Sequence, residues 1–107
     1  MADSLKDRVG DLLIELGVTP ALKGFYYILD AVEIYIGNPG IKAMDMYEVI
    51  AIRHNTEAGR VDRSLRHAFS KISEYHKASY FGDVKYSNMG YISIIAWKER
   101  GNHGKEN

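Results

Sequence analysis

The sequence predicts a predominantly helical domain that contains a helix-turn-helix, and three observations lead to this prediction. Apolar residues recur at spacings of three and four along the first two thirds of the chain, as they do on one face of a helix. The segment G-N-P-G at 37–40 separates two such stretches, because Gly and Pro interrupt helices and favour turns. A short helix and a longer one then follow each other across a brief turn, which is the outline of a helix-turn-helix.

Length and composition limit the organisation of the chain. Its 107 residues, 46% of them apolar, suffice for one compact core, so we expect a single domain over 1–100 and a disordered tail over 101–107. There is no cysteine and no apolar run long enough for a secretory signal or a membrane span, which predicts a cytoplasmic protein. Since 14 Lys and Arg residues balance 14 Asp and Glu residues, an anionic partner has to be bound by a local patch.

The first two helices are expected at 4–16 and 21–36. Ser4 can cap the start of the first helix and Gly17 can cap its end. The apolar face of the first helix consists of Leu5, Val9, Leu12, Leu13 and Leu16. The residues at helical spacing in the second are Leu22, Phe25, Tyr26, Leu29, Val32 and Ile36. Further apolar residues widen this second stripe, so we expect the second helix to lie at the centre of the domain.

A short third helix is expected at about 42–53, followed by a turn and a fourth helix. The residues expected to point inward from the third helix are Met46, Tyr47, Val49, Ile50 and Ile52. His54 and Asn55 form the turn. The side-chain oxygen of Thr56 is expected to cap a fourth helix that runs from Glu57 to about His76.

The last third of the chain leaves two alternatives open. Loop signals occur at 81–83 and 87–90, and the segment Y-I-S-I-I-A-W at 91–97 is rich in β-branched and aromatic residues. By propensity, this segment could pair with V-K-Y at 84–86 in a β-hairpin, which would make a winged-helix domain. By periodicity, it could equally be a closing helix.

The fourth predicted helix has a basic face and an apolar face. Successive residues are about 100° apart on a helix, which brings the basic side chains to one side, with Arg66 toward the rim. The members of this basic face are Arg60, Arg63, His67 and Lys71. The opposite face consists of Val61, Leu65, Ala68, Phe69 and Ile72. The helix is therefore expected to pack on the domain with one side and to project cations from the other.

Two interpretations of the basic face compete. A charged helix face is most often simply solvated. Here, however, the cations are mainly arginine, whose planar guanidinium suits phosphate oxygens and the O6 and N7 edge of guanine. They also lie in the first half of the helix, where a recognition helix meets base edges.

Two other residues of this helix have alternative interpretations as well. Asp62 can form a surface ion pair with Arg66, four residues further on, or accept a hydrogen bond from the amino group of a cytosine. Gly59 fits either close approach to a DNA backbone or a tolerated glycine in a first helical turn.

The segment H-N-T-E-A-G-R-V-D-R-S-L-R-H-A-F at 54–69 resembles the C-terminal DNA-binding domain of the response regulator stage 0 sporulation protein A. That family typically has F-N-T-T-A-S-R-V-E-R-A-I-R-H-A-I in the same register. Shorter resemblances are E-L-G-V-T-P-A-L-K-G-F-Y-Y-I at 15–28, Y-E-V-I-A at 47–51 and S-Y-F-G at 79–82. The resemblance covers most of residues 10–99 and implies an all-α fold of about six helices, with the last helix near 88–99.

The resemblance further implies binding to short asymmetric sites in double-stranded DNA, often as a homodimer in tandem, with the helix at about 57–76 in the major groove. Carried over by position, it makes Arg60, Asp62 and Arg63 the residues expected to contact bases. Together with the helix geometry, it makes the residues expected near phosphates Asn55, Thr56, Gly59, Arg66, His67 and Lys71.

The leading hypothesis is therefore a DNA-binding regulator of transcription, associated with the bacterial nucleoid, with RNA polymerase as a further possible contact. The family carries a phosphorylated receiver domain upstream, and this chain begins at residue 1 with no room for one, so we expect a freestanding domain. The alternative is a protein-interaction module that antagonises a full-length homologue by mixed assembly or competition for sites, through the last helix and Trp97. The four histidines lack metal-ligand spacing and no nucleophile or phosphate-loop motif occurs, so we expect no enzyme, no cofactor and no metal.

Overall fold

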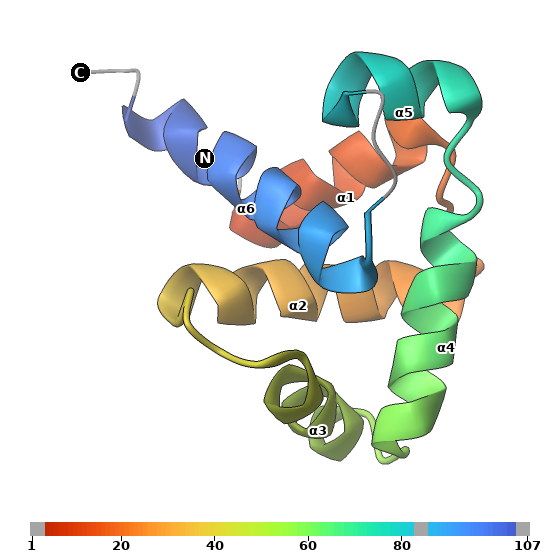
Figure 1. Cartoon of the computed structure of the whole chain (residues 1–107), viewed down its shortest axis with the longest axis vertical. Coiled ribbons are helices and arrows are strands. Elements are labelled where there is room, and N and C mark those ends of the chain that lie inside the picture. Colours follow the sequence, from red (N-terminus) through yellow and green to blue (C-terminus); the bar gives the residue numbers. More distant parts are fainter. Residues whose placement is uncertain (1–3, 83–85, 105–107) are drawn as a thin grey trace.

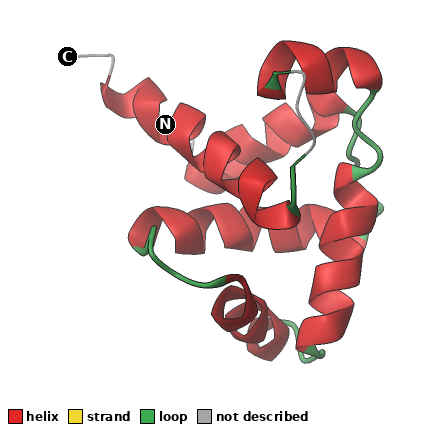
Figure 2. Ribbon diagram, in the orientation of Figure 1, coloured by secondary structure: helices red, strands yellow, loops and turns green. Residues whose placement is uncertain are grey.

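The computed structural model describes residues 4–82 and 86–104, and within these residues the chain forms six helices and no strand (Figures 1 and 2). The helices are α1 (Leu5–Leu16), α2 (Lys23–Gly37), α3 (Ala43–Arg53), α4 (Ala58–Phe69), α5 (Glu74–Phe81) and α6 (Asn88–Gly104). The predicted all-α fold with a helix-turn-helix is confirmed. The β-hairpin alternative for the last third is wrong, because the segment at 91–97 lies within α6.

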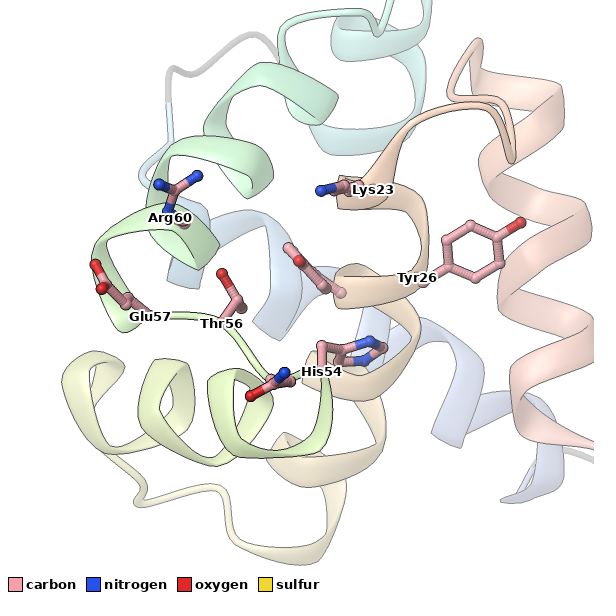
Figure 3. A pocket seen from close by; sticks show the side chains of 8 residues that line it. Lys23, Tyr26, His54, Thr56, Glu57 and Arg60 are labelled. Atoms are coloured by element: carbon pink, nitrogen blue, oxygen red, sulfur yellow. The ribbon is translucent and has the colours of Figure 1, made fainter.

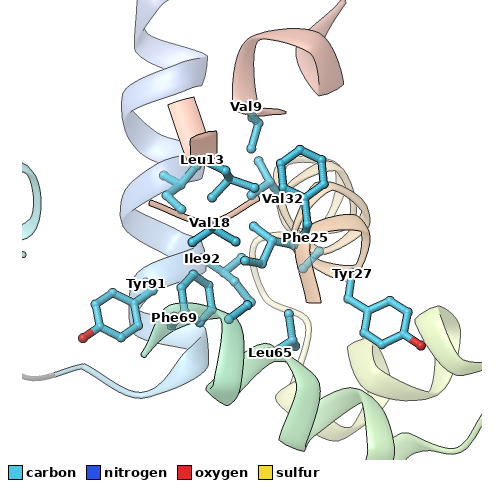
Figure 4. Packing of buried hydrophobic residues seen from close by; sticks show 14 of the residues in the cluster. Val9, Leu13, Val18, Phe25, Tyr27, Val32, Leu65, Phe69, Tyr91 and Ile92 are labelled. Carbon is cyan, nitrogen blue, oxygen red and sulfur yellow. The ribbon is translucent and has the colours of Figure 1, made fainter. Parts of the chain in front are cut away.

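Helix α2 lies at the centre of the fold, as its wide apolar stripe predicted. It packs against α1, α3, α4 and α6. In Figure 1, α1 and α6 lie on one side of α2 and α3 lies on the other, while α4 crosses the N-terminal end of α2. Each of these helices contributes to the largest fully buried side chains, and Val18 adds one from the loop after α1. Those from the helices are Val9, Leu13, Ile28, Val32, Met46, Ile50, Val61, Leu65, Ile92 and Ile95. Figure 4 shows how these helices converge on one shared core.

The predicted caps of α1 are confirmed. The Ser4 hydroxyl oxygen accepts a hydrogen bond from the backbone N–H of Asp7 at 3.0 Å, which satisfies one of the free donors of the first turn. Gly17 ends the helix with φ of 109°, in the left-handed region that favours glycine. Its backbone N–H donates to the carbonyl of Ile14 at 3.1 Å.

The inward face of α3 differs from the prediction at two positions. Met46, Tyr47 and Ile50 are buried as expected, but Val49 is 37% exposed and Ile52 is 82% exposed. Helix α3 packs against α2 and α4, and its buried residues are Met46, Tyr47, Ile50 and Ala51. The buried stripe is therefore narrow, and Val49 and Ile52 lie outside it.

The fourth helix is shorter than predicted and starts one residue later. It ends at Phe69, and a separate helix α5 begins after Ser73, so the prediction of one helix to His76 is wrong. The Ser73 hydroxyl caps α5 by accepting from the backbone N–H of His76 at 3.2 Å. The Ser70 hydroxyl donates to the carbonyl of His67 at 2.6 Å, and such local bonds compete with helix continuation.

The N-terminal cap of α4 also differs from the prediction. Glu57, not Thr56, is the capping residue, and its side chain makes no capping hydrogen bond. Thr56 belongs to the turn, where its backbone N–H donates to the carbonyl of Ala51 at 2.9 Å. Asn55 has φ of 53°, a conformation that asparagine tolerates better than most residues, and this residue lets the chain turn between α3 and α4.

Helix α6 continues to Gly104, into the segment for which a tail was expected, and residues 105–107 lie outside the described part of the chain. Tyr91, Ile92, Ile95 and Ala96 form its buried face. The Phe69 and Tyr91 rings stack with centroids 4.8 Å apart, which joins the end of α4 to α6. None of the helices in the described ranges is long and apolar enough to span a membrane.

Candidate nucleic-acid interface

Helices α3 and α4 and the turn between them form the helix-turn-helix, and α2 supports both. The turn is fixed by His54, whose Nε2 lies 2.7 Å from Oδ2 of Asp30 in α2. Asp30 also accepts a hydrogen bond from Nζ of Lys6 at 2.7 Å. Arg53, the last residue of α3, lies 3.6 Å from the same carboxylate. The orientation of α4 is therefore set by a charged cluster as well as by apolar packing.

The charge of Asp30 is a consequence of these contacts. Its side chain is almost completely buried, and burial by itself raises the pKa of a carboxyl group. The hydrogen bonds from Lys6 and His54 outweigh burial, so the pKa of Asp30 lies below its usual value. The group is thus ionised at neutral pH and can hold the histidine and the lysine together.

The two faces of α4 are opposed, as the helix geometry predicted. Val61, Leu65, Ala68 and Phe69 are buried. Arg60, Arg63 and His67 are exposed on the other side.

Lys71 was predicted to extend this row. It lies beyond the end of α4, in the segment that leads to α5, and it is exposed there. The exposed basic face of α4 therefore has three members.

The arginines of α4 differ in their partners. Within the described residues, Arg60 and Arg63 form no ion pair. Arg66 does pair: its Nη2 lies 2.7 Å from Oδ2 of Asp62, four residues earlier. Of the two interactions predicted for Asp62, the ion pair with Arg66 is present in the structure. Arg60 and Arg63 remain available to an anion outside the chain.

Asp62 has a second partner, which sequence reasoning missed. Asn88, the first residue of α6, donates from Nδ2 to Oδ1 of Asp62 at 3.0 Å. The same amide donates to the hydroxyl of Tyr47 at 3.2 Å. Burial raises the pKa of Tyr47, so its hydroxyl is neutral at pH 7. No local sequence signal links positions 47, 62 and 88, because they meet only through tertiary packing.

A groove runs beside the basic face of α4 and is shared with the start of α2. Its largest part, about 850 Å³, lies beside the turn (Figure 3). The residues that line this part are Lys23, Tyr26, Tyr27, His54, Asn55, Thr56, Glu57 and Arg60. Two smaller hollows continue along α4, and both are lined by Lys23 and Arg63. Predicted turn residues and predicted helix residues are thus brought to one concave surface.

Lys23 is a cationic member of this groove that the sequence analysis did not predict. It is exposed at the first position of α2 and extends toward α4 in Figure 3. Lys23 lies in the segment at 15–28 that resembles the family, but its position in the sequence gives no sign that it lies near α4. Only the crossing of α2 and α4 places it beside Arg60 and Arg63.

Gly59, the remaining predicted site residue, is exposed and has room for a side chain. A Cβ built there would have one neighbour, Nη1 of Arg63 at 3.6 Å, which is an ordinary contact distance. The fold therefore does not require glycine at this position. Among the described residues, no group of His, Asp and Glu side chains has the geometry to hold a metal ion.

A protein-family model described as sporulation initiation factor Spo0A C terminal matches residues 9–96. The matched range begins inside α1 and ends inside α6. It includes the helix-turn-helix, the groove and both contacts of Asn88. The match therefore extends over the whole helical core and does not rest on the basic face of α4 alone.

Proposed function

Since the chain belongs to the family of sporulation initiation factor Spo0A C-terminal domains, which bind DNA and regulate transcription in sporulation, we propose that it reads specific DNA sequences with α4. Helix α4 lies in the major groove and acts as the recognition helix of the helix-turn-helix. The observation that carries this proposal is the exposed, unpaired state of Arg60 and Arg63 on the outer face of α4.

Arg60 and Arg63 are the proposed base readers. Arg60 lies in the first turn of α4, the part of a recognition helix that reaches base edges. A guanidinium can donate two parallel hydrogen bonds to O6 and N7 of guanine, a pattern that no other base pair presents in the major groove. Asp62, the third base contact expected from the family, already has Arg66 and Asn88 as partners.

The proposed phosphate contacts surround these two arginines. They are Asn55, Thr56, the backbone at Gly59, Arg66, His67 and Lys71, and Lys23 of α2 joins them. Contacts to phosphates fix the register of a protein on DNA without reading its sequence. Residues from α2, the turn and α4 line the same groove, so one DNA strand can contact all three. Such a protein acts in the bacterial cytoplasm, at the nucleoid.

Selection from a random pool of duplexes tests this function directly. The wild-type protein should enrich one short motif, and a repeat of that motif at one helical-turn spacing would indicate two subunits bound in tandem. The absence of any enriched motif at moderate salt would contradict the proposal. Arg60→Ala, run in parallel, should leave a pool with relaxed base choice at one or two positions.

An exposed tryptophan favours a second candidate function, the binding of another protein. Trp97 of α6 is 68% exposed, and the guanidinium of Arg100 lies 4.8 Å from its ring centroid. A hollow of about 250 Å³ beside it is lined mostly by apolar groups of α2 and α6. A module that antagonises a full-length homologue would use such a surface. Tight association with that homologue and no shift of any duplex would support this candidate over the first.

A further inference from the structure

Asn88 connects α6 to both helices of the helix-turn-helix. Its Nδ2 lies 3.0 Å from Oδ1 of Asp62, 3.2 Å from the backbone carbonyl oxygen of Asp62 and 3.2 Å from the hydroxyl oxygen of Tyr47. A primary amide has two N–H hydrogens, so the three acceptors share them. Tyr47 belongs to α3 and Asp62 to α4. One side chain of α6 therefore contacts both helices at their crossing.

The carboxylate that Asn88 holds is also the carboxylate that holds Arg66. Oδ1 of Asp62 accepts from Asn88, and Oδ2 accepts from Nη2 of Arg66 at 2.7 Å. The Asp62 side chain is 35% exposed and the Arg66 side chain 64% exposed. An exposed ion pair of this spacing restrains two long side chains only weakly by itself. Here one end of the pair is fixed by Asn88, so Arg66 has a partner whose position is set.

Arg66 would have room to move without this partner. It lies at the rim of a hollow of about 330 Å³ between α4 and the start of α6, which Lys77, Tyr86 and Asn88 also line. A flexible arginine beside open space loses conformational freedom when it binds a phosphate, and that loss weakens binding. A restraint that exists before DNA arrives removes part of this cost.

We propose, on the basis of the function above, that Asn88 is a positioning residue for DNA binding. Through Asp62, it holds the Arg66 guanidinium in place on α4 before a phosphate arrives. Helix α6 thereby takes part in DNA binding although it lies outside the helix-turn-helix. Asp62 is the link between Asn88 and Arg66.

A double-mutant cycle with Asn88→Ala and Arg66→Ala tests this link on the duplex that the wild-type protein selects. In the wild type, Arg66→Ala should weaken binding about three- to tenfold and lower the salt slope by about one. In the Asn88→Ala background, Arg66→Ala should weaken binding clearly less than in the wild type, because an Arg66 that is no longer restrained contributes less to the phosphate contact. Thermal melts of each variant separate loss of binding from loss of fold.

Ser93→Ala is the matched control, because it truncates a polar side chain of α6 whose hydrogen bond stays within that helix, to the carbonyl of Gly90. The effects of Ser93→Ala and Arg66→Ala on the free energy of DNA binding should add. If Arg66→Ala costs the same in the Asn88→Ala protein as in the wild type, with both folded, the positioning role is excluded. Additivity in the Asn88→Ala cycle is thus the result that overturns the proposal.

Asp62→Asn tests the same link between Asn88 and Arg66 without removing the contact of residue 62 with α6. The amide oxygen can still accept from Asn88, but it no longer attracts the guanidinium of Arg66. This variant should fold like the wild type and should also reduce the effect of Arg66→Ala, and an undiminished effect would reject the link even if Asn88→Ala does not fold. If the wild-type protein enriches no duplex at all, the proposed function fails and this inference fails with it.

Discussion

Gly24 of α2 lies against the backbone carbonyl of Ser64 in α4, so closely that a Cβ on Gly24 would lie 2.3 Å from that oxygen. The same Cβ would lie 2.6 Å from Cβ of Ala68. Backbone atoms cannot move aside as the end of a flexible side chain can, so the absence of a side chain at Gly24 sets the distance between the two helices. This crossing also brings Lys23 to the basic face of α4.

Gly24→Ala should therefore force α2 and α4 apart. We expect the free energy of unfolding to fall by about 1–3 kcal/mol, the usual cost of overpacking a closely packed site. Urea denaturation measures this change. Gly37→Ala is the control, because a Cβ there has no neighbour within 4 Å; this variant should be neutral or stabilised by up to about 1 kcal/mol. Equal stability of the two variants would contradict the close crossing.

Asp30→Asn should destabilise the protein in a pH-dependent manner. The pKa of Asp30 is lowered in the folded state, so its ionisation stabilises the fold at pH values above the usual range of an aspartate. We expect the variant to lose about 1–3 kcal/mol of unfolding free energy at pH 7. The difference from wild type should shrink as the pH falls through the lowered pKa, because the wild-type carboxylate is then protonated.

Unfolding curves at a series of pH values provide the measurement for Asp30→Asn. Asp11→Asn changes an exposed aspartate of α1 and should have little effect at any of these pH values. A deficit of Asp30→Asn that stays constant down to the most acidic value would show that the charge of Asp30 does not matter.

Arg60→Ala should weaken binding to the selected duplex by about 1–3 kcal/mol, the range for a bidentate arginine contact with guanine. Binding to a scrambled duplex should change much less. Titrations of both duplexes at the same salt concentration give the comparison. The same loss on both duplexes would mean that Arg60 contacts the backbone and reads no base.

Lys23→Ala should weaken binding to all duplexes to a similar extent and lower the salt slope by about one, as the loss of one phosphate contact does. Lys98→Ala removes the same charge from α6, where Nζ lies 3.9 Å from the ring centroid of Tyr80. The salt slope of this control should stay at the wild-type value. An unchanged slope for Lys23→Ala would remove α2 from the interface.

Glu57→Gln should strengthen binding to all duplexes. Glu57 lines the same groove as Lys23 and Arg60, and its negative charge repels phosphates there. Its side chain makes no capping hydrogen bond, so the change should leave the melting temperature nearly unaffected. We expect about a two- to fivefold gain in affinity at low salt that declines as salt is added. A loss of affinity would indicate that Glu57 contacts DNA directly.

Local signals in the sequence sufficed for much of the fold. Ser4 and Gly17 mark both ends of α1, because caps depend on residues that are neighbours in the chain. The break after Phe69 was missed, since the apolar spacing continues to Ile72 and only the side chains of Ser70 and Ser73 reveal it. In α3, Val49 and Ile52 fit the apolar periodicity but lie outside the narrow face that α2 and α4 cover.

The candidate site was predictable to the extent that it lies on one helix. The opposed faces of α4 follow from helical spacing alone. Lys23 and Asn88 come from α2 and α6, and their places beside Arg60 and Asp62 depend on how the helices cross. A single sequence contains no local sign of such contacts, so they require the tertiary structure.

The central place of α2 also determines how the molecule opens. Since α2 packs against α1, α3, α4 and α6, its amide hydrogens can exchange with solvent deuterium only when most of the core comes apart. Helix α5 contributes Phe81 as its buried residue, and its amides should exchange through small local openings. The core helices that support α4 should therefore persist or unfold together as one cooperative unit.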